Sequence, residues 1–370
     1  MRDKLPGLNG LRAIAASFVL FGHVYQIAGD FGDTSVATFF KNHDLLGINM
    51  VNLFFVISGF IITHVMFVEQ KKTGTVSLRN FYFKRILRIW PLYFGILILV
   101  LIADHYTGLY TNYPSINGKG LFLLCFFIMN FAFVYPGYNI SVLPHYWSLS
   151  IEEQFYIFWP PFFKFLKDKR KLYFPIAVIL GIIGGRALVV ILFRLHPDPF
   201  LTNLLELLSI SKFGSISMGV IAAWLIHHDH SILRFLYLNW VQILSWMVLA
   251  GTILFNYKIP YIHFEVTAFF YAIIVVNVTT NTRNIFMPEN RFFDTTGKIS
   301  YGLYMYHWPL IPIIAGAFRQ IGIWDFSVKY HQLPLLICSY TFAFGLAWLS
   351  YKYFESVFLK MRPGHTNQKG

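Results

Sequence analysis

GLNGLRAIAASFVLFGH, residues 7–23, is the first long apolar run of the chain, yet it carries Arg12 near its start and His23 well inside. A helix that crosses a lipid bilayer needs about 20 mainly apolar residues. An ionisable side chain within such a helix is costly and is therefore a candidate for function. The run predicts a membrane helix that carries two candidate site residues.

The composition extends this prediction to the whole chain. Of the 370 residues, 56% are hydrophobic and 19% aromatic, whereas only 13% are charged, which does not suit a water-facing surface. No soluble domain fits between the apolar runs. We therefore expect an all-α, polytopic integral membrane protein that forms a single transmembrane domain over residues 1–370, with no appended soluble domain.

Ten apolar runs are long enough to cross the membrane, and an eleventh is shorter. The predicted spans cover residues 11–29, 46–68, 86–103, 148–166, 172–193, 213–228, 236–256, 263–280, 299–318 and 333–356. The eleventh run, GLFLLCFFIMNFAFVY at 120–135, is followed by Pro136 and Gly137. Whether it crosses matters, because every later loop would then change sides.

The distribution of positive charge selects one topology. A net charge of +13 would suit nucleic-acid binding, but the basic residues gather in short loops such as 70–85 and 167–171. Cytoplasmic loops of membrane proteins show this enrichment. With 120–135 re-entrant, 22 of the 30 Lys and Arg residues face the cytoplasm. We expect about ten transmembrane helices plus a re-entrant segment near 120–135, both termini cytoplasmic, and no nucleic-acid partner.

Arg12 and His23 share one face of the predicted first helix. At ~100° per residue they lie within about 20° of each other and about 16 Å apart along the axis. Arg12 is then near the cytoplasmic boundary and His23 near the middle of the membrane. Each also has an ordinary interpretation, Arg12 as a snorkelling or topology-setting residue and His23 as a hydrogen bond between helices.

A second basic cluster lies in FKRILRIWP, residues 83–91. Arg85 and Arg88 are three residues apart and share a helix face near the start of the third span. Cations near a helix N-terminus oppose the helix dipole, so a bound anion would stabilise them. The anion could be the headgroup of a membrane lipid, or a phosphorylated cofactor whose arm reaches toward His23.

Four segments, taken in order, resemble a known family. They are the arginine–ten residues–histidine pattern of Arg12 and His23, the R-x-x-R motif RILR (85–88), HYWSLSIEEQFYIFWP (145–160) and KISYGLYMYHWPL (298–310). Together they resemble the membrane-bound acyltransferase 3 family, multi-span enzymes that acylate sugars outside the cytoplasm. The resemblance runs over about residues 5–357.

The resemblance implies an acyl-CoA-dependent O-acetyltransferase that moves acetyl from cytoplasmic acetyl-CoA to a hydroxyl of an extracytoplasmic glycan. The acceptor would be an O-antigen of lipopolysaccharide, an exopolysaccharide or a lipid-linked sugar of the cell envelope. The enzyme would lie in the bacterial inner membrane, and no metal is expected.

Three arginines suit the donor, and one histidine suits the chemistry. Arg12, Arg85 and Arg88 would bind the CoA phosphates by charge-assisted hydrogen bonds. His23 would act as general base on the sugar hydroxyl, because the ordinary pKa of histidine is about 6.5. An acyl-histidine intermediate on His23 is the other mechanism that the sequence allows.

The segment WSLSIEEQFY contains two acids with different expected roles. Glu152 matches the acidic position of the family, and we assign it to the site, where it would align His23 or bind acceptor hydroxyls. Glu153 follows Ser150 at the spacing of a capping box and would stabilise a helix start. Trp147 would stack on the sugar or belong to the interfacial aromatic belt.

Four more residues are candidates for binding the acceptor. Asn49 and Asn52 are polar residues in the outer half of the second span, and Tyr304 and His307 belong to the ninth. His307 lies about eight residues into its span, at a depth similar to that of His23. It would bind substrate or form a structural hydrogen bond.

Charged residues within the spans also leave a second class of function open. Arg186 needs a partner, for which Glu206 or a phosphate is available. Intramembrane His, Glu and Arg residues line proton-coupled transporters, which makes a transporter the alternative function. Against it, the sequence shows no paired broken helices or repeat halves.

Overall fold

The computed structural model describes residues 5–30, 45–110, 113–134, 137–322 and 332–363. Within these ranges all regular structure is helical, which confirms the all-α prediction. The elements are α1 (Leu8–Asp30), α3 (Leu45–Thr73), α4 (Leu78–Thr107), α5 (Gly118–Cys125), η1 (Met129–Phe133), α6 (Tyr146–Phe165), α7 (Asp168–Leu195), α8 (Pro199–Ile210), α9 (Phe213–His227), α10 (Ile232–Leu236), α11 (Asn239–Leu254), α12 (His263–Thr280), α13 (Arg291–Lys298), α14 (Ser300–Gln320), α15 (Gln332–Leu349), η2 (Ser350–Glu355) and α16 (Ser356–Lys360).

Seven helical stretches of the described chain are long and apolar enough to cross a membrane, so the protein is a polytopic membrane protein. Each of the ten predicted spans coincides with a helix of the structure. The three outside the set of seven are α6, α11 and α14. Helix α11 has only 16 residues. The apolar character of α6 is reduced by acids, prolines and tyrosines, and that of α14 by prolines, tyrosines and a histidine.

The predicted re-entrant run is broken into two short helices. It contains α5 and the 3-10 helix η1, and between them Phe127 has a left-handed backbone with φ of 55°. The eight residues of α5 extend only about 12 Å along a helix axis. Neither helix can cross a bilayer, as the prediction required; residues 135 and 136 lie outside the described ranges.

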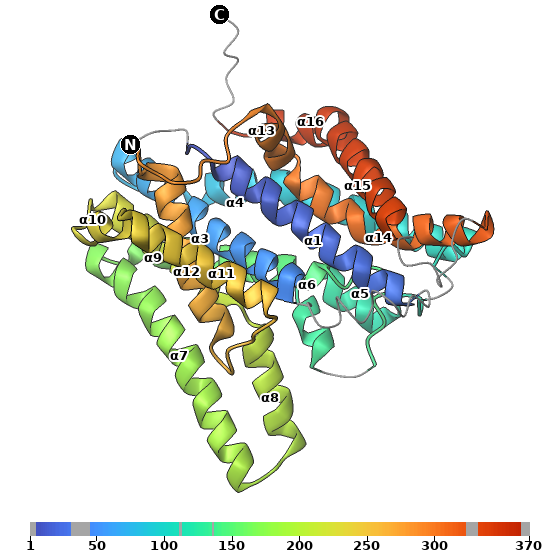
Figure 1. Ribbon diagram of the computed structural model, residues 1–370, viewed down its shortest axis with the longest axis horizontal. Coiled ribbons are helices and arrows are strands. Elements are labelled where there is room, and N and C mark those ends of the chain that lie inside the picture. Colours follow the sequence, from blue (N-terminus) through green and yellow to red (C-terminus); the bar gives the residue numbers. More distant parts are fainter. Residues whose placement is uncertain (1–4, 31–44, 111–112, 135–136, 323–331, 364–370) are drawn as a thin grey trace, which may run out of the picture.

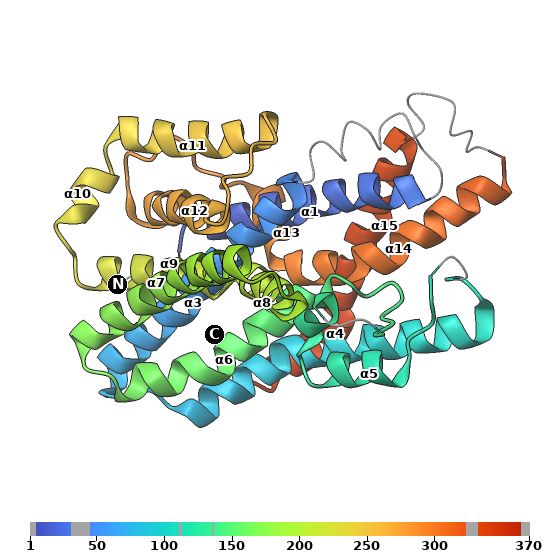
Figure 2. The same cartoon turned by 90° about the horizontal axis from the view of Figure 1, so that it is seen from below.

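Helices α1 and α3 occupy the middle of the bundle (Figure 1). Helix α1 packs against α3, α13 and α14, while α3 packs against α9 and α12. Figure 2 shows α4, α5 and α6 on one side of this pair and α11 and α12 on the other. At the crossing of α3 and α9, a Cβ on Gly59 would lie 2.1 Å from the carbonyl oxygen of Ile216, so only glycine allows this approach.

Helices α7 and α8 form a hairpin that extends away from the rest of the bundle (Figure 1). Arg186 of α7 is 2% exposed and fastens this hairpin to α12. It donates to Glu265 at 2.9 Å, to the carbonyl oxygen of Tyr261 at 2.7 Å and to that of Leu208 at 2.8 Å. The predicted partner was wrong, because Glu206 is exposed and the counter-charge of Arg186 is Glu265.

Candidate active site

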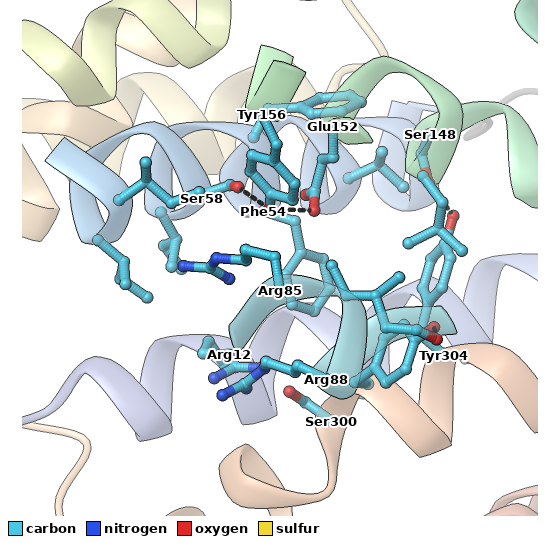
Figure 3. Close-up of a pocket in the computed structure, with 18 residues that line it drawn as sticks. Arg12, Phe54, Ser58, Arg85, Arg88, Ser148, Glu152, Tyr156, Ser300 and Tyr304 are labelled. Carbon is cyan, nitrogen blue, oxygen red and sulfur yellow. Dashed lines mark hydrogen bonds between the residues drawn. The ribbon is translucent and has the colours of Figure 1, made fainter. Parts of the chain in front are cut away.

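A cavity of about 180 Å³ lies between α1, α3, α4, α6 and α14. Figure 3 shows three arginines at one end of it and Ser148 with Tyr304 at the other. We call the part lined by Arg12, Arg85 and Arg88 the cationic end, and the part lined by Ser148 and Tyr304 the hydroxyl end. The wall contributed by α3 is mostly apolar, so the polar chemistry is concentrated at the two ends.

The cationic end combines arginines from two helices, Arg12 from α1 and both Arg85 and Arg88 from α4. Within the described residues none of them forms an ion pair with a carboxylate. Arg85 lies over the ring of Tyr156, with its guanidinium carbon 5.1 Å from the ring centroid. Guanidinium groups that face one cavity repel one another and favour an anion with several negative charges.

The start of helix α4 is not the anion site that the sequence predicted. The helix begins at Leu78 after the cap residue Ser77, whose side chain accepts from Asn80 N at 3.4 Å. Arg85 and Arg88 therefore lie about 10 and 15 Å further along the axis. The helix dipole acts mainly within the first turn, so the site depends on arginine side chains and not on the helix end.

Glu152 is the acid of the cavity wall. Its Oε2 accepts a hydrogen bond from the Tyr156 hydroxyl at 2.8 Å, and this hydroxyl contacts Ser58 Oγ at 2.5 Å. Its charge acts on all three arginines of the cationic end. Within the described contacts, Glu152 does not touch His23, so its expected aligning role has no direct contact behind it.

Tyr304 closes the hydroxyl end. Its hydroxyl contacts Ser148 Oγ at 2.7 Å and donates to the carbonyl oxygen of His145 at 3.0 Å. Its ring centroid lies 5.4 Å from that of His307. The described lining of the cavity includes Tyr304 but neither His307 nor His23, so the two histidines lie outside the cavity, with His307 next to Tyr304.

Behind Tyr304, His23 of α1 and His307 of α14 form a pair. His23 Nδ1 and His307 Nε2 are 2.7 Å apart, and the two rings are stacked with centroids 5.0 Å apart. The similar depth predicted for these histidines is therefore confirmed. His307 is buried and His23 is half-buried, so His23 retains an open side although it does not line the cavity.

The contacts of the pair determine which nitrogens carry protons. His307 Nδ1 faces the carbonyl oxygen of Tyr304, which can only accept, so this nitrogen carries a proton. In neutral His307 the other nitrogen, Nε2, is then an acceptor, and His23 Nδ1 must donate to it. Neutral His23 consequently has an unprotonated Nε2, which is the form that a general base requires.

Two residues beside the pair, His145 and Trp308, were missed by the sequence reasoning. Trp308 lies with its ring centroid 4.2 Å from that of His23, and His145 lies 5.2 Å from His307. Both ring nitrogens of His145 are buried without a hydrogen-bond partner among the described residues. His145 belongs to segment 145–160 and Trp308 to segment 298–310, the two segments that resemble the family, and this could have marked both as site candidates. In the described part of the chain, no group of histidine, cysteine and acidic residues is arranged to hold a metal ion.

The structure places three predicted acceptor-binding residues elsewhere. Asn49 Oδ1 contacts His263 Nε2 at 2.9 Å, and Asn52 donates to the carbonyl oxygen of Phe264 at 2.9 Å. Both asparagines are buried, and these contacts fasten α3 to α12. Trp147 packs against an aromatic ring of α3, with centroids 5.9 Å apart. These side chains are outside the described lining of the cavity.

The capping box predicted for Glu153 was also wrong. Helix α6 begins at Tyr146, one turn before Ser150, whose hydroxyl donates to the Tyr146 carbonyl oxygen at 3.1 Å. Glu153 Oε2 instead accepts from Trp90 Nε1 at 3.3 Å. Glu153 therefore faces α4, about 100° around the helix from Glu152.

The fold and the site define a polytopic membrane protein with an arginine-lined cavity that leads toward a histidine pair. The sequence profile of the family described as "Acyltransferase domain" matches residues 5–352. This match covers nearly the whole chain, and the chain belongs to the acyltransferase 3 family of enzymes.

Its bacterial relatives are distant in sequence. A Staphylococcus aureus (strain COL) protein, provisionally named an O-acetyltransferase, is 26% identical over 96% of this chain and 57% of the relative. The peptidoglycan O-acetyltransferase OatA of Listeria monocytogenes is 28% identical over 50% of this chain and 28% of its own length. The chain spans little more than half the length of the first of these relatives. No solved structure matches the chain at a significant level.

Proposed function

We propose that this protein is a transmembrane O-acetyltransferase, which moves acetyl from cytoplasmic acetyl-CoA to a hydroxyl of an extracytoplasmic glycan. One observation carries the proposal: the cavity joins the cationic end to Tyr304, directly in front of the His307–His23 pair. Membership of the acyltransferase 3 family favours this function over the transporter that the sequence left open.

The proposed topology has ten membrane helices, a single transmembrane domain and both termini in the cytoplasm of a bacterium, with the chain in the inner membrane. Short links join α3 to α4 and α6 to α7 at one end of the bundle. The basic stretches 70–85 and 167–171 cover these links and the helix ends beside them, and such an enrichment is typical of the cytoplasmic side. The terminal residues 1–4 and 364–370 lie outside the described ranges.

The donor enters from the cytoplasm in this proposal. Arg12 is the fifth residue of α1, whereas His23 lies about 16 Å further along the same helix. The phosphates of acetyl-CoA bind at the cationic end, and its pantetheine arm follows the cavity toward Tyr304. Glu152 orients the arginines through its charge and the Tyr156 hydrogen bond.

The headgroup of an anionic lipid is the other ligand that these arginines could bind. They converge from two helices on a cavity between five helices, and not on the lipid-facing surface of the bundle. This placement favours a ligand that enters the protein over a headgroup that stays in the lipid layer.

The proposed chemistry uses the unprotonated Nε2 of His23. It takes the proton of the sugar hydroxyl while the oxygen attacks the thioester carbonyl carbon. The C–O bond forms, the C–S bond breaks, and the CoA thiolate leaves with the electron pair. The His23 imidazolium then gives the proton to sulfur, which yields CoA and the acetyl ester. His307 is a positioning residue, because its Nε2 accepts from His23 Nδ1 throughout.

Tyr304 must turn aside before the thioester can meet His23. Its hydroxyl is held by two hydrogen bonds, to Ser148 and to the His145 carbonyl oxygen. Neutral hydrogen bonds contribute about 1 kcal/mol each, so this movement is accessible when donor binding drives it.

The acceptor approaches His23 from its open side. His23 is half-buried but does not line the described cavity, which separates the donor route from the acceptor route. Trp308, which contacts His23, replaces Trp147 as the aromatic residue beside the reacting groups. The acceptor class is a peptidoglycan, O-antigen, exopolysaccharide or lipid-linked sugar, of which peptidoglycan is the one named for a relative.

The test follows radiolabelled acetyl from acetyl-CoA into cell-envelope glycans in membranes that contain the full chain. His23→Ala should reduce transfer by about 10²-fold or more, because a general base contributes that much. His105→Ala, at the exposed last turn of α4, is the matched control and should transfer normally. Normal transfer by a fully inserted His23→Ala protein would remove His23 from the mechanism, and ping-pong kinetics would indicate an acyl-histidine intermediate.

A further inference from the structure

The C-terminal part of the described chain returns to the cationic end of the cavity. Helix α15 continues into the π-helical segment η2 and then into α16, and both η2 and α16 pack against α4. Helix α4 is the helix that carries Arg85 and Arg88. Arg362 follows α16 by two residues, so the chain delivers it to the helix that forms the cationic end.

Arg362 is half-buried, and two hydrogen-bond donors of its guanidinium are unused. Its Nε and Nη2 atoms are buried and have no hydrogen-bond partner among the described residues. Burial, and then the positive charges of Arg88 and Arg85, lower the pKa of Arg362 to about 10. A buried donor without a partner, placed beside two like charges, destabilises the protein unless an anion lies among them.

Neighbouring basic residues do not share this environment. Lys360 is exposed, and Lys352 is exposed with its ammonium 4.9 Å from the ring centroid of Trp348. Both can be solvated where they are. The partial burial of Arg362 is therefore not a general property of the basic residues near it.

The acids nearby are too few to neutralise the arginines. Glu355, the last residue of η2, is buried, accepts from Ser350 Oγ at 3.2 Å and acts through its charge on Arg88. Glu152 is the acid of the cavity wall. Glu153 also acts through its charge on Arg85, although it is hydrogen-bonded to Trp90 and is outside the described cavity lining. Four arginines and these three carboxylates leave a net charge of +1 when all are ionised. An anionic ligand complements this site.

We propose that Arg362 is a fourth phosphate-binding residue, which extends the donor site from the cationic end to the place where η2 and α16 pack against α4. This inference rests on the proposed function and deepens it, because it names a further residue that binds the phosphates of the donor. The match to the family profile ends at residue 352, so Arg362 lies beyond it.

The test measures ligand binding to the purified full chain in phosphatidylcholine nanodiscs by calorimetry. The probes are CoA and pantetheine, which has the same arm but no phosphate. Arg362→Ala should weaken CoA binding about tenfold or more, as expected for one charge-assisted hydrogen bond, and leave pantetheine unaffected. Arg362→Lys, which retains the charge, should recover part of the loss. Lys360→Ala removes an exposed charge two residues away and should change neither affinity.

Three outcomes would overturn either the assignment of Arg362 or the proposed function, and each outcome is distinct. Unchanged CoA affinity in Arg362→Ala, beside weakened affinity in Arg88→Ala, would overturn the assignment of Arg362 and leave the proposed function standing. No CoA binding by the unaltered chain would overturn the proposed function itself. A lipid-headgroup site would appear in nanodiscs with phosphatidylglycerol, where Arg362→Ala would alter only the response to that lipid, and it would also overturn the assignment.

Discussion

Two groups of arginines lie within the helices of this protein, and they have opposite environments. Arg186 is ion-paired with Glu265 and bound to two backbone carbonyl oxygens. Arg12, Arg85 and Arg88 face a cavity and, within the described residues, have no carboxylate partner in an ion pair. An intramembrane arginine with all its donors used joins helices, whereas one with open donors can bind a ligand. The sequence alone does not distinguish the two kinds, because each is a costly charge within an apolar run.

The largest expected effect is on the stability of the paired arginine. Arg186→Ala leaves Glu265 buried without its ion-pair partner and should destabilise the protein by about 3–5 kcal/mol. Arg85→Ala removes a charge from a repulsive cluster and should cost little stability. Thermal unfolding in detergent would measure both. The double variant Arg186→Met with Glu265→Leu should recover most of the loss, and equal effects of Arg186→Ala and Arg85→Ala would abolish the distinction.

The cavity arginines should show the reverse pattern in kinetics. Arg88→Ala should raise the KM for acetyl-CoA by about 10-fold to 150-fold, the equivalent of about 1.5–3 kcal/mol for a hydrogen bond to a charged group. S-acetylpantetheine, which lacks phosphates, should be used equally well by both proteins. Arg186→Lys, measured as the control, should retain the normal KM; a raised KM there would show that the two groups are not separate.

The histidine pair should give a smaller effect on kcat alone. His307→Ala removes the acceptor of the His23 Nδ1–H bond and should lower kcat about tenfold, the effect expected from losing about 1.4 kcal/mol, with an unchanged KM for acetyl-CoA. His307→Gln offers an amide oxygen as the acceptor and should retain more activity. A rise in KM without a fall in kcat would place His307 in donor binding instead.

Tyr304 should give the smallest effect. Tyr304→Phe removes the hydrogen bonds to Ser148 and to His145 but keeps the ring between the cavity and His307. The ring should turn aside more readily, so the change in kcat should be within about fivefold in either direction, or about 1 kcal/mol. Ser148→Ala should behave in the same way, and a loss of 100-fold in either variant would mean that the Tyr304 hydroxyl takes part in the chemistry.

Much of the fold could be predicted because each membrane helix is specified locally. An apolar run of sufficient length has to satisfy its own backbone, and the ten predicted runs all became helices. The short helices α8, α10 and α13 were not predicted, because each is shorter than the apolar run that a membrane span needs. The π-helical segment η2 was not predicted either, because it has no distinct sequence pattern.

Contacts between distant helices could not be predicted. His23 and His307 are separated by 284 positions, and only their equal depth could be inferred beforehand. For Arg186 the sequence offered Glu206 or a phosphate, whereas its partner Glu265 belongs to α12. Asn49 and Asn52 appeared available for the same reason, since one sequence does not show that α12 covers them.

The most direct test of the account is a structure of the full chain with a non-hydrolysable thioether analogue of acetyl-CoA. The account predicts phosphate density against Arg12, Arg85 and Arg88 and a displaced Tyr304 side chain. It also predicts that the carbonyl carbon of the analogue lies about 3.5 Å from the position that the acceptor oxygen would occupy when hydrogen-bonded to His23 Nε2. An analogue bound elsewhere, with lipid on the arginines and Tyr304 still hydrogen-bonded to Ser148, would contradict it.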